Sequence, residues 1–380
     1  RNDKQFSSCE RVLLSVCVFL PVWFAKRNGK PPFSLTPLKR AEEFVPTSDE
    51  LSAQVKNNDV AIITLGRTSG EASDRRVEEF YLKENESALI KQVAEAYRAA
   101  GKKVIVILNI CSPVETASWK NMVDAVICAF QPGQEVGNCV ADVLTGKVNP
   151  SGHLPMTFAI KYGDAPSDSN FPYDYEFKMP SFAMGSGMNF ESKEKEEKPK
   201  EAVRNVDFTD YEEGIYVGYR YFETFDKEVS YPFGHGLSYT TFSFEIVSSD
   251  INGDNCEMKV AVKNTGNCAG KESVQVYVKA PAGGLEKPAK ELKAFAKTKL
   301  LQPGESEVVT LSWKLMDMAS LNEKSSSWEL PKGTYQWMVG ASSADVRCTV
   351  TQKVSKAQKV KVHNAMIPPY KIAQHDMVKR

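Results

Sequence analysis

The chain has 380 residues, of which 42% are hydrophobic and 25% are charged, as is usual for a soluble globular protein with room for two domains. Lys and Arg together number 48, as do Asp and Glu, and this balance gives no support for a nucleic-acid partner. The eight cysteines and four histidines form no CxxC and no paired Cys/His spacing. We therefore expect neither a metal nor another cofactor.

Residues 1–44 form an N-terminal segment for which we expect partial or irregular structure. The chain begins with Arg, which we interpret as a fragment or a processed form. Val12–Ala25 is strongly apolar, but it is shorter than the about 20 residues of a membrane span and contains Pro21, so we expect no stable membrane insertion. A signal-peptide core and a buried strand both stay open, and with them a secreted or a cytoplasmic location.

Residues 45–160 alternate between apolar runs and stretches with helical spacing. Strands are expected at Val60–Leu65, Lys103–Ile110 and Ala125–Phe130, and helices at Asp49–Asn57 after an N-cap at Ser48, at Lys83–Gly101, from Pro113 to Met122, and from about Gln131 to Gly146. Apolar strands of this kind are buried on both faces of a parallel sheet. The alternation predicts an α/β doubly wound sandwich domain with a mostly parallel sheet.

A polar loop, RTSGEASDRR, follows the first of these strands and spans Arg67–Arg76. In an open α/β sheet, the loop at the carboxyl end of a strand is where ligands bind. Glu71 is the candidate general acid/base, with Arg75 or Arg76 as an electrostatic neighbour. The alternative is an ordinary solvated surface loop.

A second carboxylate, Asp74, lies three residues from Glu71. Two carboxylates about 5–10 Å apart across a substrate could act as a glycosidase pair. Residues so close in one loop seldom face each other across a sugar ring, so we assign Asp74 a structural role. The structural residues expected near the site are Ser69, Gly70, Asp74 and Arg75.

Four other features received weaker assignments. Gly133–Gly137 lies between a strand and a helix, where phosphates are often bound. It lacks the Lys-Ser/Thr of a P-loop and the third glycine of a dinucleotide motif, so we do not expect nucleotide binding. His153 and His235 have no neighbouring nucleophile motif and are interpreted as structural or unassigned. The tyrosines of Gly214–Phe222 either stack on a sugar or, more commonly, pack between domains. Among the cysteines, Cys128 and Cys139 are expected in the core, whereas Cys256 and Cys268 either pair or stay free.

Residues 161–240 are expected to form an extended linker with a charged, solvated insertion at Glu191–Lys200. Residues 241–356 contain seven short runs that alternate apolar and polar residues. In one of them, Met258, Val260 and Val262 alternate with Lys259, Ala261 and Lys263. Turn residues separate these runs at the spacing of a β-sandwich, which predicts an all-β fibronectin type III-like domain. Residues 357–380 are interpreted as a C-terminal tail, either a linker or a surface arm.

Several long motifs occur in the order seen in one known family. They are TSGEASDR followed by FYL, then KKVIVILNI, SPVETASW, QPGQEVGNCVADVLTGKVNPSGHLPMTF, EEGIYVGYRYFETF and YPFGHGLSYTTF. Over about residues 45–355 the chain resembles the family-three glycoside hydrolases, the β-glucosidase and β-xylosidase group. The resemblance implies a six-stranded α/β sandwich followed by a fibronectin type III-like domain, and it implies that Glu71 is the acid/base.

The family's (β/α) barrel, which carries the aspartate nucleophile, has no counterpart in this sequence. The resemblance therefore implies one portion of a retaining, β-glucosidase-like hydrolase of terminal β-D-glycosides, with a β-linked oligosaccharide or glycoside as substrate and a barrel of the same protein as partner. The isolated chain is expected to be weakly active or inactive. The alternative is an inactive fragment or pseudo-enzyme that serves as a carbohydrate- or protein-interaction module. Neither the sugar nor the linkage follows from the sequence.

Overall fold

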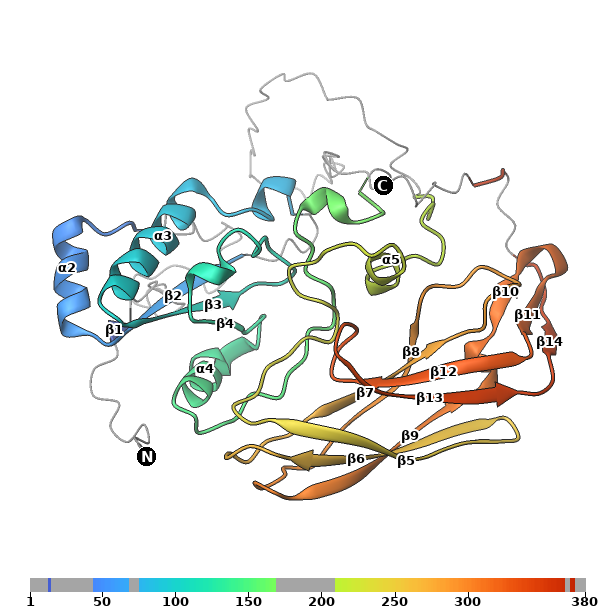
Figure 1. Ribbon diagram of the computed structural model, residues 1–380. Coiled ribbons are helices and arrows are strands. Elements are labelled where there is room, and N and C mark those ends of the chain that lie inside the picture. Colours follow the sequence, from blue (N-terminus) through green and yellow to red (C-terminus); the bar gives the residue numbers. More distant parts are fainter. Residues whose placement is uncertain (1–12, 15–43, 68–74, 169–208, 366–369, 373–380) are drawn as a thin grey trace, which may run out of the picture. The chain divides into compact units, whose positions relative to one another are not determined.

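Figure 1 presents the computed structural model of the chain, which describes residues 13–14, 44–67, 75–168, 209–365 and 370–372. The charged stretch Glu191–Lys200 lies outside the described residues. The chain divides into two compact units. The first comprises residues up to 70 together with 77–148, and the second comprises residues 71–76 together with 149 onwards.

A parallel sheet forms the centre of the first unit, with the strand order β1-β2-β3-β4. These strands are β1 (Leu13–Leu14), β2 (Val60–Gly66), β3 (Lys103–Asn109) and β4 (Ala125–Cys128), and all three pairings are parallel. The prediction of a parallel α/β sheet is thus confirmed. Of the apolar run Val12–Ala25, the described part is Leu13–Leu14, and these two residues form a strand.

Helices α2 (Ser48–Asn57), α3 (Glu84–Ala99) and α4 (Val136–Leu144) accompany the sheet. Figure 1 shows α3 on one face of the sheet and α4 on the other. Ile90, Val93 and Tyr97 of α3 are buried against the sheet, on one face because they recur at helical spacing. Gly101 follows α3 with φ +68°, a left-handed conformation that glycine adopts at low cost and that ends helices.

Two predictions about helices need correction. The N-cap of α2 is Thr47, not Ser48, because the Thr47 side chain and Glu50 form a reciprocal capping box. The expected helix from Pro113 to Met122 is wrong, since only a 3-10 turn at Lys120–Met122 forms. The Glu115 carboxylate accepts hydrogen bonds from both the amide and the hydroxyl of Ser118, at 2.7 and 2.8 Å, and so competes with helical bonding there.

The strand expected at Ala125–Phe130 ends at Cys128, and Phe130 has φ +52°. The expectation for Cys139 is also wrong, because Cys139 is exposed on α4, while Cys128 is partly buried. Burial raises the pKa of the Cys128 thiol to about 11. Cys256 and Cys268 are both free thiols, so the pairing alternative is not realised.

The second unit contains an antiparallel β-sandwich. Its seven main strands are β5 (Phe242–Asn252), β6 (Asn255–Asn264), β7 (Ser273–Lys279), β8 (Glu291–Lys297), β9 (Ser306–Lys314), β12 (Gly333–Gly340) and β13 (Val346–Val354). They form one sheet in the order β5-β6-β9 and another in the order β13-β12-β7-β8. All seven runs expected from the sequence are therefore strands, and the fibronectin type III-like prediction is confirmed.

Alternation along each strand directs one row of side chains into the sandwich core. Met258, Val260 and Val262 of β6 are fully buried, as the alternation with lysines predicts. Trp313 and Trp337, from the two facing sheets, pack edge to face with ring centroids 4.5 Å apart. Aromatic pairs of this geometry add stabilisation to that of their buried area.

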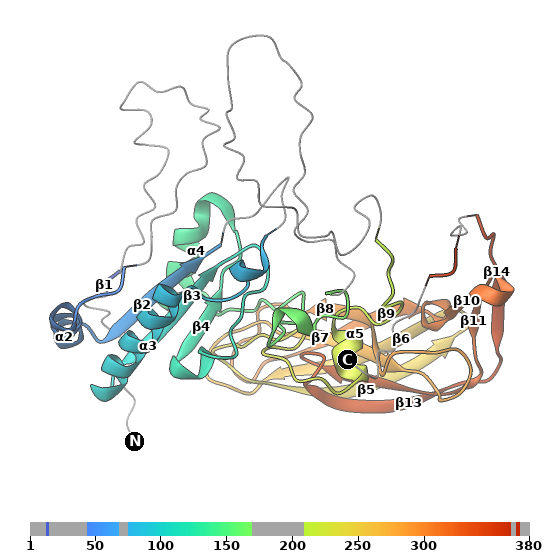
Figure 2. The same cartoon turned by 90° about the horizontal axis from the view of Figure 1, so that it is seen from above.

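A third, small sheet was not expected from the sequence. It contains β10 (Ser320–Asn322), β11 (Ser327–Leu330) and β14 (Gln358–Lys361) in the order β10-β11-β14. Figures 1 and 2 show the three strands side by side at one end of the sandwich. The start of the expected tail is thus a paired strand, since Trp328 of β11 lies opposite Val360 of β14.

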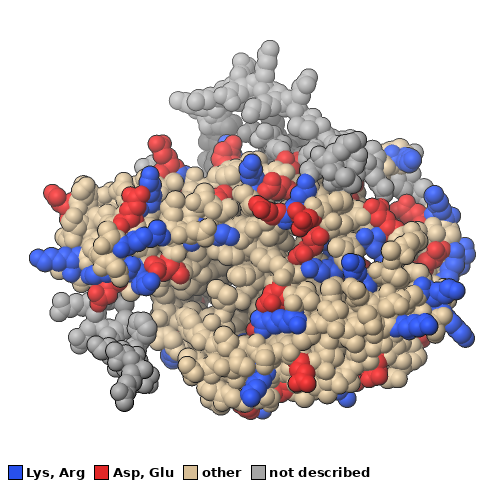
Figure 3. Space-filling view, viewed as in Figure 1, with Lys and Arg blue, Asp and Glu red and all other residues tan. Residues whose placement is uncertain are grey.

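Charged side chains are spread over the surface. Figure 3 shows Lys and Arg interspersed with Asp and Glu on the visible face of the sandwich. Among the described residues, no helix is both long enough and apolar enough to cross a membrane.

Candidate active site

The candidate acid/base loop leaves the carboxyl end of β2. Ser69, Gly70, Glu71 and Asp74 lie outside the described residues, and Arg75, at the far end of the loop, is partly buried. The position of the loop in the chain matches the place where ligands bind in open α/β sheets. The structure describes the residues on either side of the loop, and the first of these is Arg67.

Arg67 is a buried residue that makes a two-pronged ion pair with Glu86 of α3. Arg67 Nη1 lies 2.7 Å from Glu86 Oε1, and Nη2 lies 2.8 Å from Oε2. The side chains are 4% and 0% exposed. Parallel N–H···O bonds of this kind combine charge with a fixed geometry, which a lysine cannot reproduce.

The same guanidinium also binds three backbone carbonyls. Arg67 Nε donates to Glu79 O at 2.9 Å, Nη1 to Gly66 O at 2.9 Å and Nη2 to Tyr81 O at 3.0 Å. Gly66 precedes the loop and Glu79 follows it. One side chain thus connects the residue before the loop to the turn after it.

Glu86 is held from the helix side as well. Its Oε2 accepts the Lys83 backbone N–H at 2.9 Å, so the carboxylate also serves the first turn of α3. A negative charge is favourable near a helix N-terminus, where backbone N–H groups lack partners in the helix. The buried carboxylate is therefore compensated by a guanidinium and by the helix start.

The end of β3 supports the same edge of the sheet. The Arg67 backbone N–H donates to Asn109 O at 3.0 Å, and the Glu115 N–H donates to Phe80 O at 2.7 Å. The Trp119 indole N–H donates to Glu115 O at 2.8 Å. Hydrogen bonds thus connect the end of β3 to Arg67 and to the turn after the loop.

These contacts alter the expected electrostatics of the loop. The sequence places Arg67 in the same polar loop as Glu71, whereas the structure pairs its guanidinium with Glu86 inside the unit. Sequence reasoning missed Glu86 because it lies 19 positions away. The available signal was an Arg directly after a buried strand, followed by a Glu in the first turn of the next helix.

His153 has a structural position in the second unit. Its Nδ1 lies 2.6 Å from Gly234 O, and its Nε2 lies 3.1 Å from Glu272 Oε1. Burial opposes the charged imidazolium, but the hydrogen bonds to Glu272 and Gly234 outweigh it and raise the pKa of His153 above 6.5. The ring therefore joins the segment after Asn149 to the sandwich.

The tyrosines of Gly214–Phe222 pack within the second unit. Tyr216 and Tyr221 are buried, and the Tyr216 hydroxyl donates to Glu286 at 2.6 Å. Burial, followed by this bond, raises the pKa of Tyr216. The Tyr219 hydroxyl accepts the Leu292 N–H at 2.8 Å. Within the described parts of the chain, no cluster of three or more His, Cys, Asp or Glu side chains is arranged to hold a metal.

Comparison with known proteins identifies the family. Residues 23–239 match the model of the glycosyl hydrolase family 3 C-terminal domain, and residues 272–343 match a fibronectin type III-like domain. The chain is similar to beta-glucosidase A of Butyrivibrio fibrisolvens, with 36% identity over 82% of this chain and 39% of the relative. It is also similar to beta-glucosidase B of Emericella nidulans, with 36% identity over 77% of this chain and 32% of the relative.

Solved structures give the same result. The structure of beta-glucosidase 3B from Thermotoga neapolitana in complex with alpha-D-glucose superposes with a TM-score of 0.73 and 41% identity, over 86% of this chain and 42% of that one. The chain thus spans well under half the length of each of these relatives. The family match covers more than half of the chain and agrees with the parallel sheet, the sandwich and their order. This chain belongs to glycoside hydrolase family 3, as its C-terminal and fibronectin type III-like portion.

Proposed function

We propose that this chain supplies the general acid/base of a retaining glycoside hydrolase that cleaves terminal β-D-glycosides, and that Glu71 is that residue. The observation that supports the proposal most is the site of the TSGEASDR loop, which leaves the carboxyl end of β2 directly after Arg67, a residue buried in an ion pair with Glu86. The beta-glucosidase names of the relatives support the substrate class.

In this proposal the aspartate nucleophile belongs to a barrel of the same protein, outside these 380 residues. In a retaining mechanism the two carboxyl groups lie about 5–5.5 Å apart on either side of the glycosidic bond. The aspartate attacks the anomeric carbon while the Glu71 carboxyl gives its proton to the departing glycosidic oxygen. The Glu71 carboxylate then takes a proton from water, whose oxygen attacks the anomeric carbon; the bond from that carbon to the aspartate breaks, which releases the sugar and the free aspartate carboxylate.

The first of these steps requires Glu71 to be protonated. Enclosure of the loop against the barrel would raise its pKa, because burial disfavours the charged carboxylate. Arg75 and Arg76 would oppose this shift if their charges face it. Because Arg67 is paired with Glu86, its charge does not add to the effect of Arg75 and Arg76 on the pKa of Glu71.

The Arg67–Glu86 pair has a positioning role in the proposal. Arg67 joins the chain before the loop to the turn after it through Gly66 O and Glu79 O. A general acid must lie within hydrogen-bond reach of the oxygen that it protonates. We therefore assign Arg67 and Glu86 the task of fixing the base of the loop, without contact to substrate.

The direct test uses the protein with its barrel and an aryl β-glucoside. Glu71→Gln should lose most activity, and external azide should restore part of it by attacking the glycosyl intermediate without needing a base. Glu78→Gln is the matched control, because Glu78 is an exposed glutamate in the turn just beyond the loop. Undiminished activity of Glu71→Gln would remove Glu71 from the acid/base role.

The isolated chain gives a second test. Without a nucleophile it should hydrolyse the aryl glucoside poorly or not at all. Robust turnover that Glu71→Gln abolishes would refute the requirement for a barrel. If the protein with its barrel is itself inactive and insensitive to Glu71→Gln, the alternative of a non-catalytic interaction module replaces the proposal.

A further inference from the structure

The small sheet of β10, β11 and β14 carries an exposed row of apolar side chains. Leu321, Trp328 and Val360, one from each strand, lie opposite one another in the register of the sheet. Their exposed fractions are 45%, 43% and 48%. Apolar side chains that lie side by side on a surface, unlike those scattered singly, are typical of binding sites. Trp328 adds a flat apolar face and one N–H donor.

The opposite face of the same sheet is polar and internally bonded. The Glu329 carboxylate of β11 accepts hydrogen bonds from Asn322 of β10 at 3.2 Å and from Lys359 of β14 at 2.6 Å. It also accepts a bond at 3.1 Å from the hydroxyl of Ser327, which is 0% exposed. One carboxylate thus connects all three strands, so the apolar row lies on a fixed sheet.

Lysines outnumber acidic residues around this sheet. The segments 319–332 and 353–363, which contain its three strands, hold six lysines and two glutamates, although the whole chain has equal numbers of basic and acidic residues. The lysines are Lys324, Lys332, Lys353, Lys356, Lys359 and Lys361, and the glutamates are Glu323 and Glu329. Among the described residues, Lys359 is the one of these six that forms an ion pair, with Glu329. Figure 3 shows more blue than red side chains at the end of the sandwich where Figure 1 places β10, β11 and β14.

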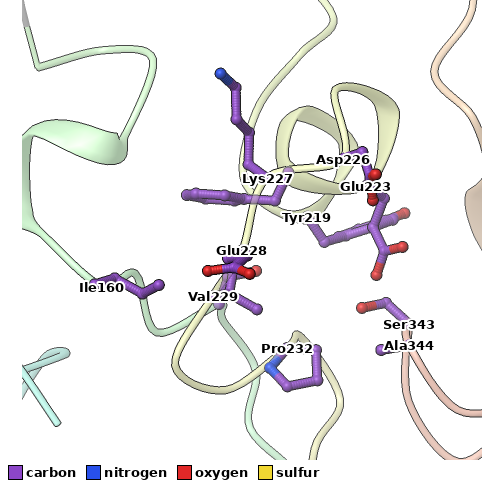
Figure 4. Close-up of a pocket in the computed structure, with 12 residues that line it drawn as sticks. Ile160, Tyr219, Glu223, Asp226, Lys227, Glu228, Val229, Pro232, Ser343 and Ala344 are labelled. Carbon is purple, nitrogen blue, oxygen red and sulfur yellow. The ribbon is translucent and has the colours of Figure 1, made fainter. Parts of the chain in front are cut away.

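A pocket elsewhere in the second unit has the opposite charge. It has a volume of about 500 Å³ and lies beside α5 (Tyr219–Thr224). Its lining includes the carboxylates of Glu223, Asp226 and Glu228 and a single lysine, Lys227 (Figure 4). An anionic partner is therefore attracted to the small sheet and not to this pocket.

A partner that fits the small sheet carries repeated negative charges and flat apolar faces. A polysaccharide that contains uronic acids has both, because its carboxylates supply the charge and its pyranose rings present C–H faces to an aromatic side chain.

A flat membrane is a poorer fit to this sheet. Side chains alternate between the two faces along a strand, so Lys359 and Lys361 lie on the face opposite to that of Val360. β14 is an outer strand of the sheet. A flexible chain can pass over this edge and contact both faces, whereas a planar surface reaches one of them.

We propose that the small sheet of the fibronectin type III-like portion binds an acidic polysaccharide, with a sugar ring packed on Trp328 and carboxylates paired with the surrounding lysines. The surface contains no residue of the Glu71 loop. The proposal therefore goes beyond the proposed catalytic function and does not depend on it.

Isothermal titration calorimetry on the whole chain tests the proposal, with polygalacturonate, the neutral glucan laminarin and phosphatidylglycerol vesicles as separate probes. Polygalacturonate should bind, and its affinity should fall as NaCl is raised from about 20 to 300 mM, because salt screens exposed charges. Trp328→Ala should weaken this binding by about 5- to 30-fold, the loss typical of a central aromatic contact. Trp328→Phe keeps an aromatic face and should lose less. Glu71→Gln should bind as the unaltered chain does.

A matched pair of double variants tests the lysines. Lys353→Gln/Lys356→Gln should weaken polygalacturonate binding by about 2- to 30-fold, as expected for two exposed charge pairs. Lys263→Gln/Lys271→Gln removes the same charge from exposed lysines outside the two segments and should leave binding unchanged. All four lysines are exposed, so the Tm of both variants should stay close to that of the unaltered chain.

Several results would overturn the proposal. They are the absence of polygalacturonate binding, equal losses in the two lysine variants, and undiminished binding in Trp328→Ala. Equally strong binding of laminarin would remove the role of charge, and binding of the vesicles in place of polygalacturonate would identify a membrane surface as the partner. If Trp328→Ala lowers the Tm, Trp328→Phe and the two lysine variants decide the outcome.

Discussion

Replacing Arg67 with methionine should destabilise the first unit severely. Methionine fills similar volume but leaves the Glu86 carboxylate, which is 0% exposed, without its ion-pair partner. The backbone oxygens of Gly66, Glu79 and Tyr81 also lose a donor. Removing one partner of a buried pair costs about 3–5 kcal/mol. Because whole domains are stable by about 5–15 kcal/mol, this is a large share.

The double variant Arg67→Met/Glu86→Leu separates the pair from the packing. It removes both charges, so no carboxylate is left buried alone, and it should recover a large part of the loss. Arg67→Lys should restore less of the stability lost in Arg67→Met than the double variant does, because an ammonium cannot bond both carboxylate oxygens and three carbonyls in one plane.

Urea denaturation followed by circular dichroism measures these changes, and hydrogen exchange at β2 and β3 assigns them to the first unit. The matched control is Lys103→Met, because Lys103 Nζ lies at the same 2.7 Å from Asp124 Oδ1 but the two side chains are 66% and 37% exposed. A surface pair of this kind contributes about 0–1 kcal/mol. Equal losses for Arg67→Met and Lys103→Met would refute the reasoning from burial.

Two further predictions concern the second unit. Burial disfavours the charged His153 ring, but hydrogen bonds to Glu272 and Gly234 outweigh it, so the pKa of His153 is raised in the folded chain. The resulting stabilisation is complete below about pH 6.5 and is lost as the pH rises through the folded-state pKa. The Tm should therefore decline with rising pH above that point, and an equal decline in His153→Gln would contradict the assignment. Gly234 has φ +80°, and an added Cβ would lie 2.3 Å from Gln275 Oε1, whereas Gly253 has φ +61° and open space around it. Gly253→Ala should lower the free energy of unfolding by about 1 kcal/mol, and Gly234→Ala should lower it clearly more. Similar urea midpoints for the two variants would contradict this reasoning.

Much of the architecture could be predicted from local pattern. Met258, Val260 and Val262 alternate with polar residues, and a two-residue period has a single explanation in a half-buried strand. Gly101 could be placed at the end of α3 because few other residues tolerate its backbone conformation. These signals lie within a few residues of each other, so they need no knowledge of the fold.

The failures involve side chains that bond to the backbone or to distant residues. Glu115 replaces a predicted helix with a turn through its bonds to Ser118, and nothing in the periodicity of that stretch distinguishes the two. The partner of Arg67 is 19 residues away across a loop and a turn.

The central claim, that Glu71 is the acid/base, is tested most directly by comparing leaving groups in the protein with its barrel. A dinitrophenyl β-glucoside departs without protonation, whereas an alkyl β-glucoside needs the proton that Glu71 would give. For Glu71→Gln we expect the glycosylation rate to stay close to normal with the dinitrophenyl glucoside and to fall about 10²–10⁴-fold with the alkyl glucoside. Equal losses on both substrates, or no loss on either, would contradict the assignment of Glu71 as the proton donor.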